Sequence, residues 1–149
     1  DAWFAEFGFE FIAHYPDYYV SRGITLSEDE VGVVSPDIFR RFFFPELVEL
    51  SRRYGGMGMH CCANARHQWD GFQQIPGLFL LNLVQPIEAL RKAYPFFEPV
   101  CAQMHSWYGD GPAEEWPGQH PPRRRVVYDL NAASPQEAAI LLEKLRPYR

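Results

Sequence analysis

The sequence lacks the features of a membrane protein or a nucleic-acid-binding protein. It contains no apolar run near the roughly 20 residues that a transmembrane helix needs, and no charged segment followed by an apolar stretch marks a signal peptide at its start. Its 14 Lys and Arg residues are outnumbered by 19 Asp and Glu residues, which gives a formal net charge of −5. Such a chain has no overall electrostatic attraction for nucleic acids or anionic membranes. We therefore expect a cytoplasmic protein that acts on a small-molecule substrate, with no nucleic-acid or membrane partner.

Cysteine is scarce, with three residues in a chain of 149. An odd number that includes the adjacent pair Cys61 and Cys62 does not make a disulfide framework of the kind found in small secreted domains. The cysteines therefore indicate a reducing compartment, and thiol or metal chemistry if they act at all. The chain also begins at Asp1 without a methionine, which is typical of a processed product or a fragment.

The composition is that of a folded, enzyme-like chain, with 47% hydrophobic, 16% aromatic and 22% charged residues. These values are close to the averages for globular domains, so disorder is not expected as the main state. Residues 1–19 are rich in aromatic side chains, and their first part is compatible with a helix packed against another element. No shift in composition marks a boundary, so we expect a single domain over residues 1–149.

Strand-like runs alternate with helical stretches after this aromatic start. The alternation predicts an α/β fold with a parallel sheet and right-handed crossovers. Five strands are more than half of a (β/α)8 barrel, whereas a complete barrel takes about 250 residues. About five strands are therefore expected, and this chain is too short to close a TIM-type barrel alone. The expected strands are Ile24–Leu26, Met57–Cys62, Leu78–Leu83, Pro99–His105 and Val126–Leu130.

Capping residues mark the expected helices. Ser35 and Pro36 supply a capping hydroxyl and a proline at the first helical position, and Pro45 predicts a kink in the helix that follows. Ser134 opens the last helix in the same way. The segment 109–125 is rich in Gly and Pro and shows no helix pattern where the alternation would place one. Further helical stretches are expected at residues 66–74 and 86–94.

Polar and apolar side chains separate onto two faces of the strand at residues 57–62, because alternate residues of a strand point to opposite sides. His60 and Cys62 share one face, while Cys61 lies on the other. In parallel α/β folds the ligand site lies at the carboxyl ends of the strands. We therefore expect His60 and Cys62 to point into one pocket there, and Cys61 to be an inert thiol beneath a helix. The first face also holds Gly56 and Gly58, and the second holds Met57 and Met59.

The same alternation groups Cys101, Gln103 and His105 on one face of the strand at residues 99–105. Polar side chains are costly to bury without partners, so we expect this face to line the site and the other face, with Val100, Ala102 and Met104, to lie beneath helices. Further polar groups at carboxyl ends of expected strands are Asn82 and the acidic turn at Glu28–Glu30.

A His-x-Cys pair has two interpretations on its own. The pair could bind a metal, although catalytic zinc generally has three protein ligands and only two are present in this motif. The pair could equally be structural, with the histidine hydrogen-bonded in the core beside a small buried thiol. His67 and His120 lie in helix and loop contexts typical of surface residues. His14 lies among aromatic residues, where a structural histidine is expected.

One stretch of sequence resembles a known family. The residues Leu26–Pro36, followed by Phe39, Pro45 and the run Gly58–Cys62, are similar to the uroporphyrinogen decarboxylase superfamily, which includes cobamide-dependent methyltransferases. The likeness extends from about Gly23 to the C-terminus. It implies that the expected strands are strands four to eight of that barrel, which makes the chain the C-terminal part of the fold.

The resemblance also implies a metal. Zinc-dependent members that methylate a thiol carry His-x-Cys on the fifth strand, which His60 and Cys62 match, and a further cysteine at the end of the last strand. The last expected strand here has no cysteine. Cys101 and His105 are substitute ligands suggested by strand alternation. The implied activity is transfer of a methyl group from a corrinoid to a thiol.

Other polar residues at these strand ends receive supporting roles under this interpretation. Asp29 or Glu30 would orient a ligand or take a proton, and Asn82 and Gln103 are candidates for contact with the cofactor.

Two alternatives stay open. A metal-free porphyrinogen-type decarboxylase would hold substrate carboxylates with arginines, for which Arg66 and the run Arg123–Arg125 are the candidates. A non-catalytic half-barrel would instead present unpaired sheet edges, which invite pairing with another chain. We therefore also expect a homo-oligomer or association with a complementing N-terminal half-barrel.

Overall fold

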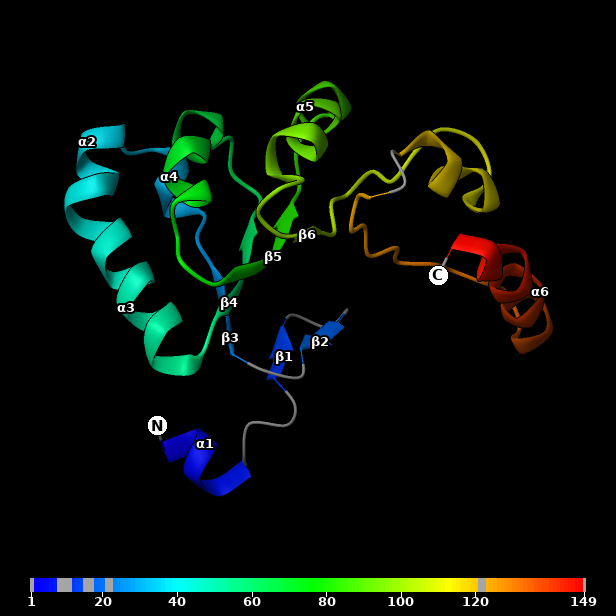
Figure 1. Ribbon diagram of the computed structural model, residues 1–149, viewed down its shortest axis with the longest axis horizontal. Helices are drawn as coiled ribbons and strands as arrows, with labels where there is room; N and C mark the ends of the chain where they lie inside the picture. The colour runs from blue at the N-terminus through cyan, green and yellow to red at the C-terminus, as the bar shows by residue number, and fades with distance from the viewer. Residues whose placement is uncertain (1, 8–11, 15–17, 21–22, 121–122, 149) are drawn as a thin grey trace.

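The computed structural model is an α/β fold built on a four-stranded sheet (Figure 1). It describes residues 2–7, 12–14, 18–20, 23–120 and 123–148. The strands β3 (Ile24–Ser27), β4 (Met57–Cys61), β5 (Leu78–Leu83) and β6 (Ala102–Gln103) are parallel and lie in sequential order. The parallel arrangement predicted from the alternation of strands and helices is therefore confirmed for these four strands. Within the described ranges, no helix is long and apolar enough to cross a lipid bilayer.

The prediction of a fifth strand at Val126–Leu130 is wrong. Val126 forms a single parallel bridge with Gln103 and no regular strand follows it. The reason is that β6 is itself too short to pair with a longer segment. The amides of Val100 and Cys101 bond to the carbonyl of Phe97 at the end of the preceding helix, so the first part of the expected strand completes a helical turn.

The first long helix follows β3 and begins as predicted. It comprises α2 (Pro36–Ile38), a π-helical turn η2 (Phe39–Phe43) and α3 (Phe44–Tyr54). The hydroxyl of Ser35 accepts a hydrogen bond of 3.3 Å from the Ile38 amide. The π-helical turn lies directly before Pro45, which lacks the amide that would continue the regular α-helical bonding. Gly55 ends the helix in the left-handed conformation, with φ 74°.

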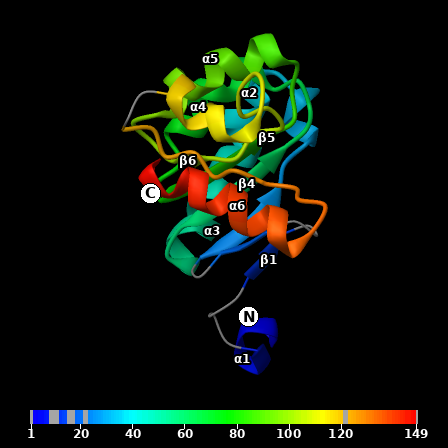
Figure 2. The same cartoon turned by 90° about the vertical axis from the view of Figure 1, so that its right-hand side faces the viewer.

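The remaining helices follow the other strands. They are α4 (Trp69–Gln73), α5 (Ile87–Phe97) and α6 (Pro135–Leu145), with 3-10 turns η1 (Glu30–Gly32), η3 (Arg66–Gln68), η4 (Ala113–Gln119) and η5 (Arg146–Tyr148). The turn η4 occupies the Gly- and Pro-rich segment for which no helix was expected. Figure 1 shows α3, α4 and α5 on one side of the sheet, and Figure 2, turned by 90° from that view, shows α6 in front of the sheet.

The N-terminal residues form α1 (Ala2–Phe7) and an antiparallel pair of short strands, β1 (Ile12–His14) and β2 (Tyr18–Val20). The helix expected for the first part of the chain is present as α1. The hairpin lies beside β3, the first strand of the parallel sheet (Figure 1). The side chain of His14 lies outside the described part of the structure.

The main core lies between the sheet and α3, α4 and α5. Met57, Met59 and Cys61 are each fully buried in it, so the prediction that this face of β4 packs beneath helices is confirmed. The glycines on the other face have a packing role. Phe79 occupies a bulge in β5, and its ring approaches within 3.1 Å of the position that a Cβ atom would take at Gly56. Leu80 and Met104 form a smaller cluster with Phe79 on that face.

Candidate metal centre

Three side chains from two neighbouring strand ends meet at the carboxyl edge of the sheet. A ligand atom from each of Asp29, His60 and Cys62 lies within 4.8 Å of the other two. Asp29 and His60 are half-buried, and Cys62 is exposed. Among the described residues, this is the one group of three or more His, Cys, Asp or Glu side chains arranged in this way. His60 and Cys62, which were expected to share one site, therefore lie together with a third residue.

Backbone packing fixes the loop that carries Asp29. Val31, two residues further on, is fully buried in the core. The side-chain amide of Gln68 donates hydrogen bonds of 3.1 and 2.8 Å to the carbonyls of Val31 and Val34. The position of Asp29 is thus set by a buried anchor and by the turn before α4, although the carboxylate itself is partly open to solvent.

The carboxylate of Asp29 is held against the end of β4. Its Oδ1 accepts a hydrogen bond of 2.6 Å from the backbone amide of Cys62. Partial burial acts to raise the pKa of this carboxyl. The hydrogen bonds from the amide and thiol of Cys62, together with the nearby His60, outweigh burial and lower the pKa below its usual value. Asp29 is therefore an anionic ligand candidate at neutral pH.

The pKa of the Cys62 thiol is shifted in the other direction from that of Asp29. Its hydrogen bond to Asp29, with smaller effects of burial and of the carboxylate charge, raises the pKa of the thiol. Without a cation the thiol is therefore protonated at neutral pH. A divalent cation between the two groups would reverse this balance, because thiolate and carboxylate would both be attracted to it and the thiol proton would be released.

The imidazole of His60 is held from the side of β5. Its Nδ1 donates a hydrogen bond to Oδ1 of Asn82, and Nδ2 of Asn82 donates to the carbonyl of Met104. His60 and Asn82 are direct partners in the register of β4 and β5. Asn82, predicted to contact a cofactor, thus bonds to the histidine of the candidate metal centre.

These three residues fit a zinc ion in their chemistry. Imidazole, thiolate and carboxylate are the three protein ligand types of zinc, and catalytic sites use three of them and leave a fourth position open. Ligand atoms around tetrahedral zinc lie roughly 3.5 Å apart, as follows from bond lengths of about 2.0–2.3 Å. The present ligand atoms lie within 4.8 Å of one another, so small side-chain movements would bring them into that range.

The prediction that Cys101, Gln103 and His105 line this site is wrong. Gln103 pairs with Leu81, whose side chain is fully buried in the core beneath the helices. The strand alternation grouped the three residues correctly, but it could not tell which face of the sheet they occupy. They lie on the side of α5, where polar partners make their burial possible.

These buried polar groups bond to one another. Nε2 of Gln103 donates to the carbonyl of Tyr94 at 2.9 Å, and Nε2 of His105 donates to Oε1 of Gln103 at 2.9 Å. Nδ1 of His105 accepts from the amide of Leu83 at 3.1 Å. Burial, with a smaller effect of His120, lowers the pKa of His105 to about 3. His105 is therefore a neutral structural residue.

Cys101 is equally unsuited to reaction, since burial raises the pKa of its thiol to about 12. The same applies to Cys61, whose pKa is raised to about 12, chiefly by burial. This agrees with the expectation that Cys61 is inert. His120 was expected at the surface, but it is 9% exposed and donates from Nε2 to the carbonyl of Tyr108 at 2.7 Å.

Glu28, expected from the sequence only as part of the acidic turn, has an unusual electrostatic environment. Burial, with the charges of Glu30, Glu46 and Asp29, raises the pKa of Glu28 to about 7. Glu28 continues the alternation of Ile24 and Leu26, which pack against the core, and this periodicity could have indicated its half-buried position. Glu30 itself is exposed in η1 and is not part of the metal-ligand group.

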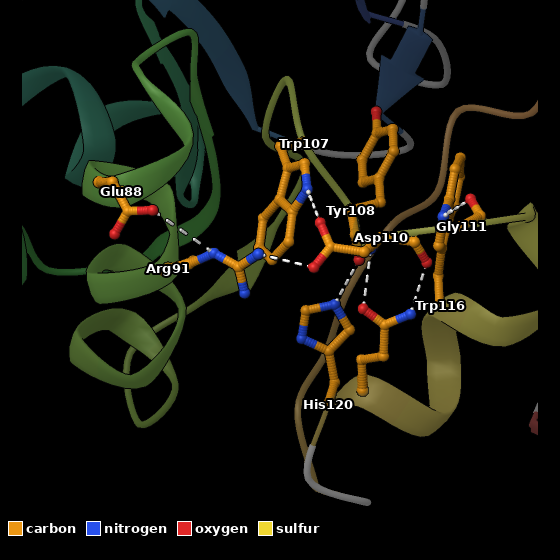
Figure 3. Close-up of polar contacts among 9 residues, drawn as sticks. Glu88, Arg91, Trp107, Tyr108, Asp110, Gly111, Trp116 and His120 are labelled. Atoms are coloured by element: carbon orange, nitrogen blue, oxygen red, sulfur yellow. Dashed lines mark hydrogen bonds and ion pairs between the residues drawn. The ribbon is translucent and has the colours of Figure 1, made fainter.

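The loop after β6 forms its own network at the same end of the sheet (Figure 3). Arg91 of α5 lies over the ring of Trp107, 4.4 Å from its centroid, and its Nη2 contacts Oδ2 of Asp110 at 2.7 Å. The side chain of Gln119 bonds to both the amide and the carbonyl of Asp110, at 2.8 and 2.7 Å. Arg91 therefore forms an ion pair with Asp110 of the same chain.

Comparison with family models, with curated proteins and with solved structures finds no match to this chain. The resemblance to the uroporphyrinogen decarboxylase superfamily therefore rests on the sequence motifs alone.

Proposed function

We propose that Asp29, His60 and Cys62 bind zinc, and that the chain is the C-terminal part of a uroporphyrinogen-decarboxylase-like barrel that transfers a methyl group from a corrinoid to a thiol. The observation that carries the proposal is the meeting of these three ligand types at the carboxyl end of a parallel sheet. Four parallel strands in sequential order, with α3, α4 and α5 on one face, support the barrel assignment.

Asp29 takes the place of the third ligand in this proposal. The superfamily pattern would supply a cysteine from the last strand, and the corresponding segment here contains none and forms a single bridge. The loop after β3 supplies a carboxylate to the same edge of the sheet. Two anionic ligands and a neutral imidazole would bring a Zn²⁺ site close to electrical neutrality, which suits a partly buried position.

Each residue of the candidate site would have a separate role in the proposed reaction. When bound, zinc would lower the pKa of a substrate thiol at its open position, so that a thiolate exists at neutral pH. Asp29 and His60 are held in place by hydrogen bonds to Cys62 and Asn82. Cys62 is exposed to solvent, so a substrate thiol would reach the metal from its side.

The test of the metal is titration of the purified chain with zinc, competed by a chromophoric chelator. We expect one zinc per chain, and we expect Cys62→Ser and Asp29→Asn to weaken binding while Glu30→Gln leaves it unchanged. Stoichiometric zinc bound equally by all four proteins would place the metal elsewhere and remove the proposal.

The methyl transfer needs its own assay. Methylcobalamin and a panel of small thiols are incubated with zinc-loaded protein, alone and with a complementing N-terminal half-barrel, and loss of the cobalt-bound methyl is followed by absorbance. Demethylation that depends on both zinc and thiol is expected. Bound zinc without demethylation in either mixture would retain the metal site and reject this activity.

A further inference from the structure

The side chain of Asn82 is fixed by two hydrogen bonds that point in opposite directions. Its Oδ1 accepts from Nδ1 of His60, and its Nδ2 donates to the backbone carbonyl of Met104. The Met104 carbonyl is held in turn, because the amide of the same residue donates to the carbonyl of Leu81 at 2.9 Å. The end of β6 therefore determines which way the Asn82 amide faces.

This orientation determines the tautomer of His60. If the amide turned over, its NH2 group would face Nδ1 and its oxygen would face the Met104 carbonyl, which would place two acceptors against each other. In the observed orientation the amide oxygen can only accept. A neutral imidazole must then carry its proton on Nδ1 and its lone pair on Nε2.

We propose that Asn82 is a positioning residue that holds His60 in the Nδ1–H tautomer, so that Nε2 is the nitrogen that binds the metal. The metal part of this inference rests on the proposed function, whereas the tautomer does not. Histidine ligands in metal sites commonly donate their other ring N–H to a carbonyl or carboxylate, and removal of such a partner typically weakens metal binding 10- to 100-fold. Asn82 would thus act on the metal without touching it.

The first measurement uses the metal-free wild-type protein. Nitrogen-15 NMR of the His60 ring identifies the protonated nitrogen, with the assignment made by comparison with His60→Gln. We expect protonated Nδ1 and unprotonated Nε2 at a pH where the ring is neutral. Protonated Nε2 would overturn the inference, whether or not the protein binds zinc.

The second measurement compares zinc affinity across variants. Asn82→Leu keeps the approximate volume and removes the acceptor, and we expect a 10- to 100-fold loss of affinity. Asn82→Asp keeps an acceptor for Nδ1, and we expect it to bind zinc more tightly than Asn82→Leu. Asn131→Leu, at an exposed position, is the matched control and should bind like wild type. Circular dichroism checks that each variant is folded.

The outcomes separate this inference from the proposed function. Unchanged or tighter zinc binding in a folded Asn82→Leu variant would overturn the positioning role. Absence of zinc binding in wild type, with the Nδ1–H tautomer found by NMR, would reject the proposed function and leave Asn82 as the residue that orients His60.

Discussion

Glu28→Gln should stabilise the protein at pH 8 and have little effect at pH 5. The pKa of Glu28 is raised from 4.5 to about 7 in the folded chain, first by burial and then by the charges of Glu30, Glu46 and Asp29. Glutamine has the shape of the protonated acid and cannot ionise. The substitution therefore removes the cost of placing a charge at this half-buried position.

The sign follows from proton binding in the two states. Below pH 4.5 the acid is protonated in both the folded and the unfolded chain, so it has no effect on the pH dependence of stability. Between pH 4.5 and about 7 the folded chain retains a proton that the unfolded chain has lost, and stability falls as the pH rises. Above about pH 7 the penalty is complete and constant.

The size of the penalty is moderate. A rise in pKa from 4.5 to about 7 corresponds to about 3.4 kcal/mol if the charge is fully desolvated. Glu28 is only half-buried, and solvent screening reduces this to about 1–2 kcal/mol. At pH 5 only a few tenths of a kcal/mol remain, because the unfolded acid is then only partly ionised.

Urea unfolding at pH 5 and pH 8 measures this difference, with Glu49→Gln as control because Glu49 is exposed on α3. We expect Glu28→Gln to gain about 1–2 kcal/mol over wild type at pH 8 and Glu49→Gln to change little at either pH. An equal effect of Glu28→Gln at both pH values, or a loss of stability at pH 8, would refute the reasoning.

Three further predictions follow from the site and the fold. Below the pKa of the Cys62 thiol, zinc affinity should rise about tenfold per pH unit, because binding releases one thiol proton; a pH-independent affinity from calorimetry would contradict this. Gly56→Ala should destabilise more than Gly55→Ala in urea unfolding. Both glycines have positive φ, which costs about 1–2 kcal/mol for alanine. Only at Gly56 would the new Cβ also meet other atoms, those of Gly77 and Phe79, at 3.0 and 3.1 Å. Equal losses of unfolding free energy in the two variants would contradict the packing account. Light scattering should show an oligomer, or a complex with an N-terminal half-barrel, because in the described residues no further strand joins the parallel sheet beyond β3 or β6; a stable monomer that does not bind such a partner would count against this.

The orientation of the side chains on strand β4 could be predicted from the sequence because its two faces carry different types of residue. Met57, Met59 and Cys61 are apolar and fully buried, and the alternate residues are small or polar. Alternation alone was therefore enough to place His60 and Cys62 together. The bulge at Phe79 was not foreseen, since it depends on how an aromatic ring fits against glycines of the neighbouring strand.

Strand β6 could not be interpreted in the same way. Gln103 and His105 are polar, which suggested a site, but they bond to each other and to Tyr94. A polar pair that satisfies itself can be buried beneath a helix, and the sequence does not reveal such tertiary partners. The third candidate ligand was also missed for this reason, because Asp29 and Cys62 are far apart in sequence and meet only through the parallel pairing of β3 and β4.

The most direct test of the central claim is the zinc content of the chain purified without chelator, measured by mass spectrometry for wild type, Cys62→Ser and Cys61→Ser. The three proteins differ by one atom at adjacent positions, one thiol being exposed at the candidate site and the other buried in the core. We predict about one zinc per chain in wild type and Cys61→Ser, as expected for a single site with three protein ligands, and loss of zinc in Cys62→Ser. Equal zinc in wild type and Cys62→Ser, or none in any of the three, would contradict the account.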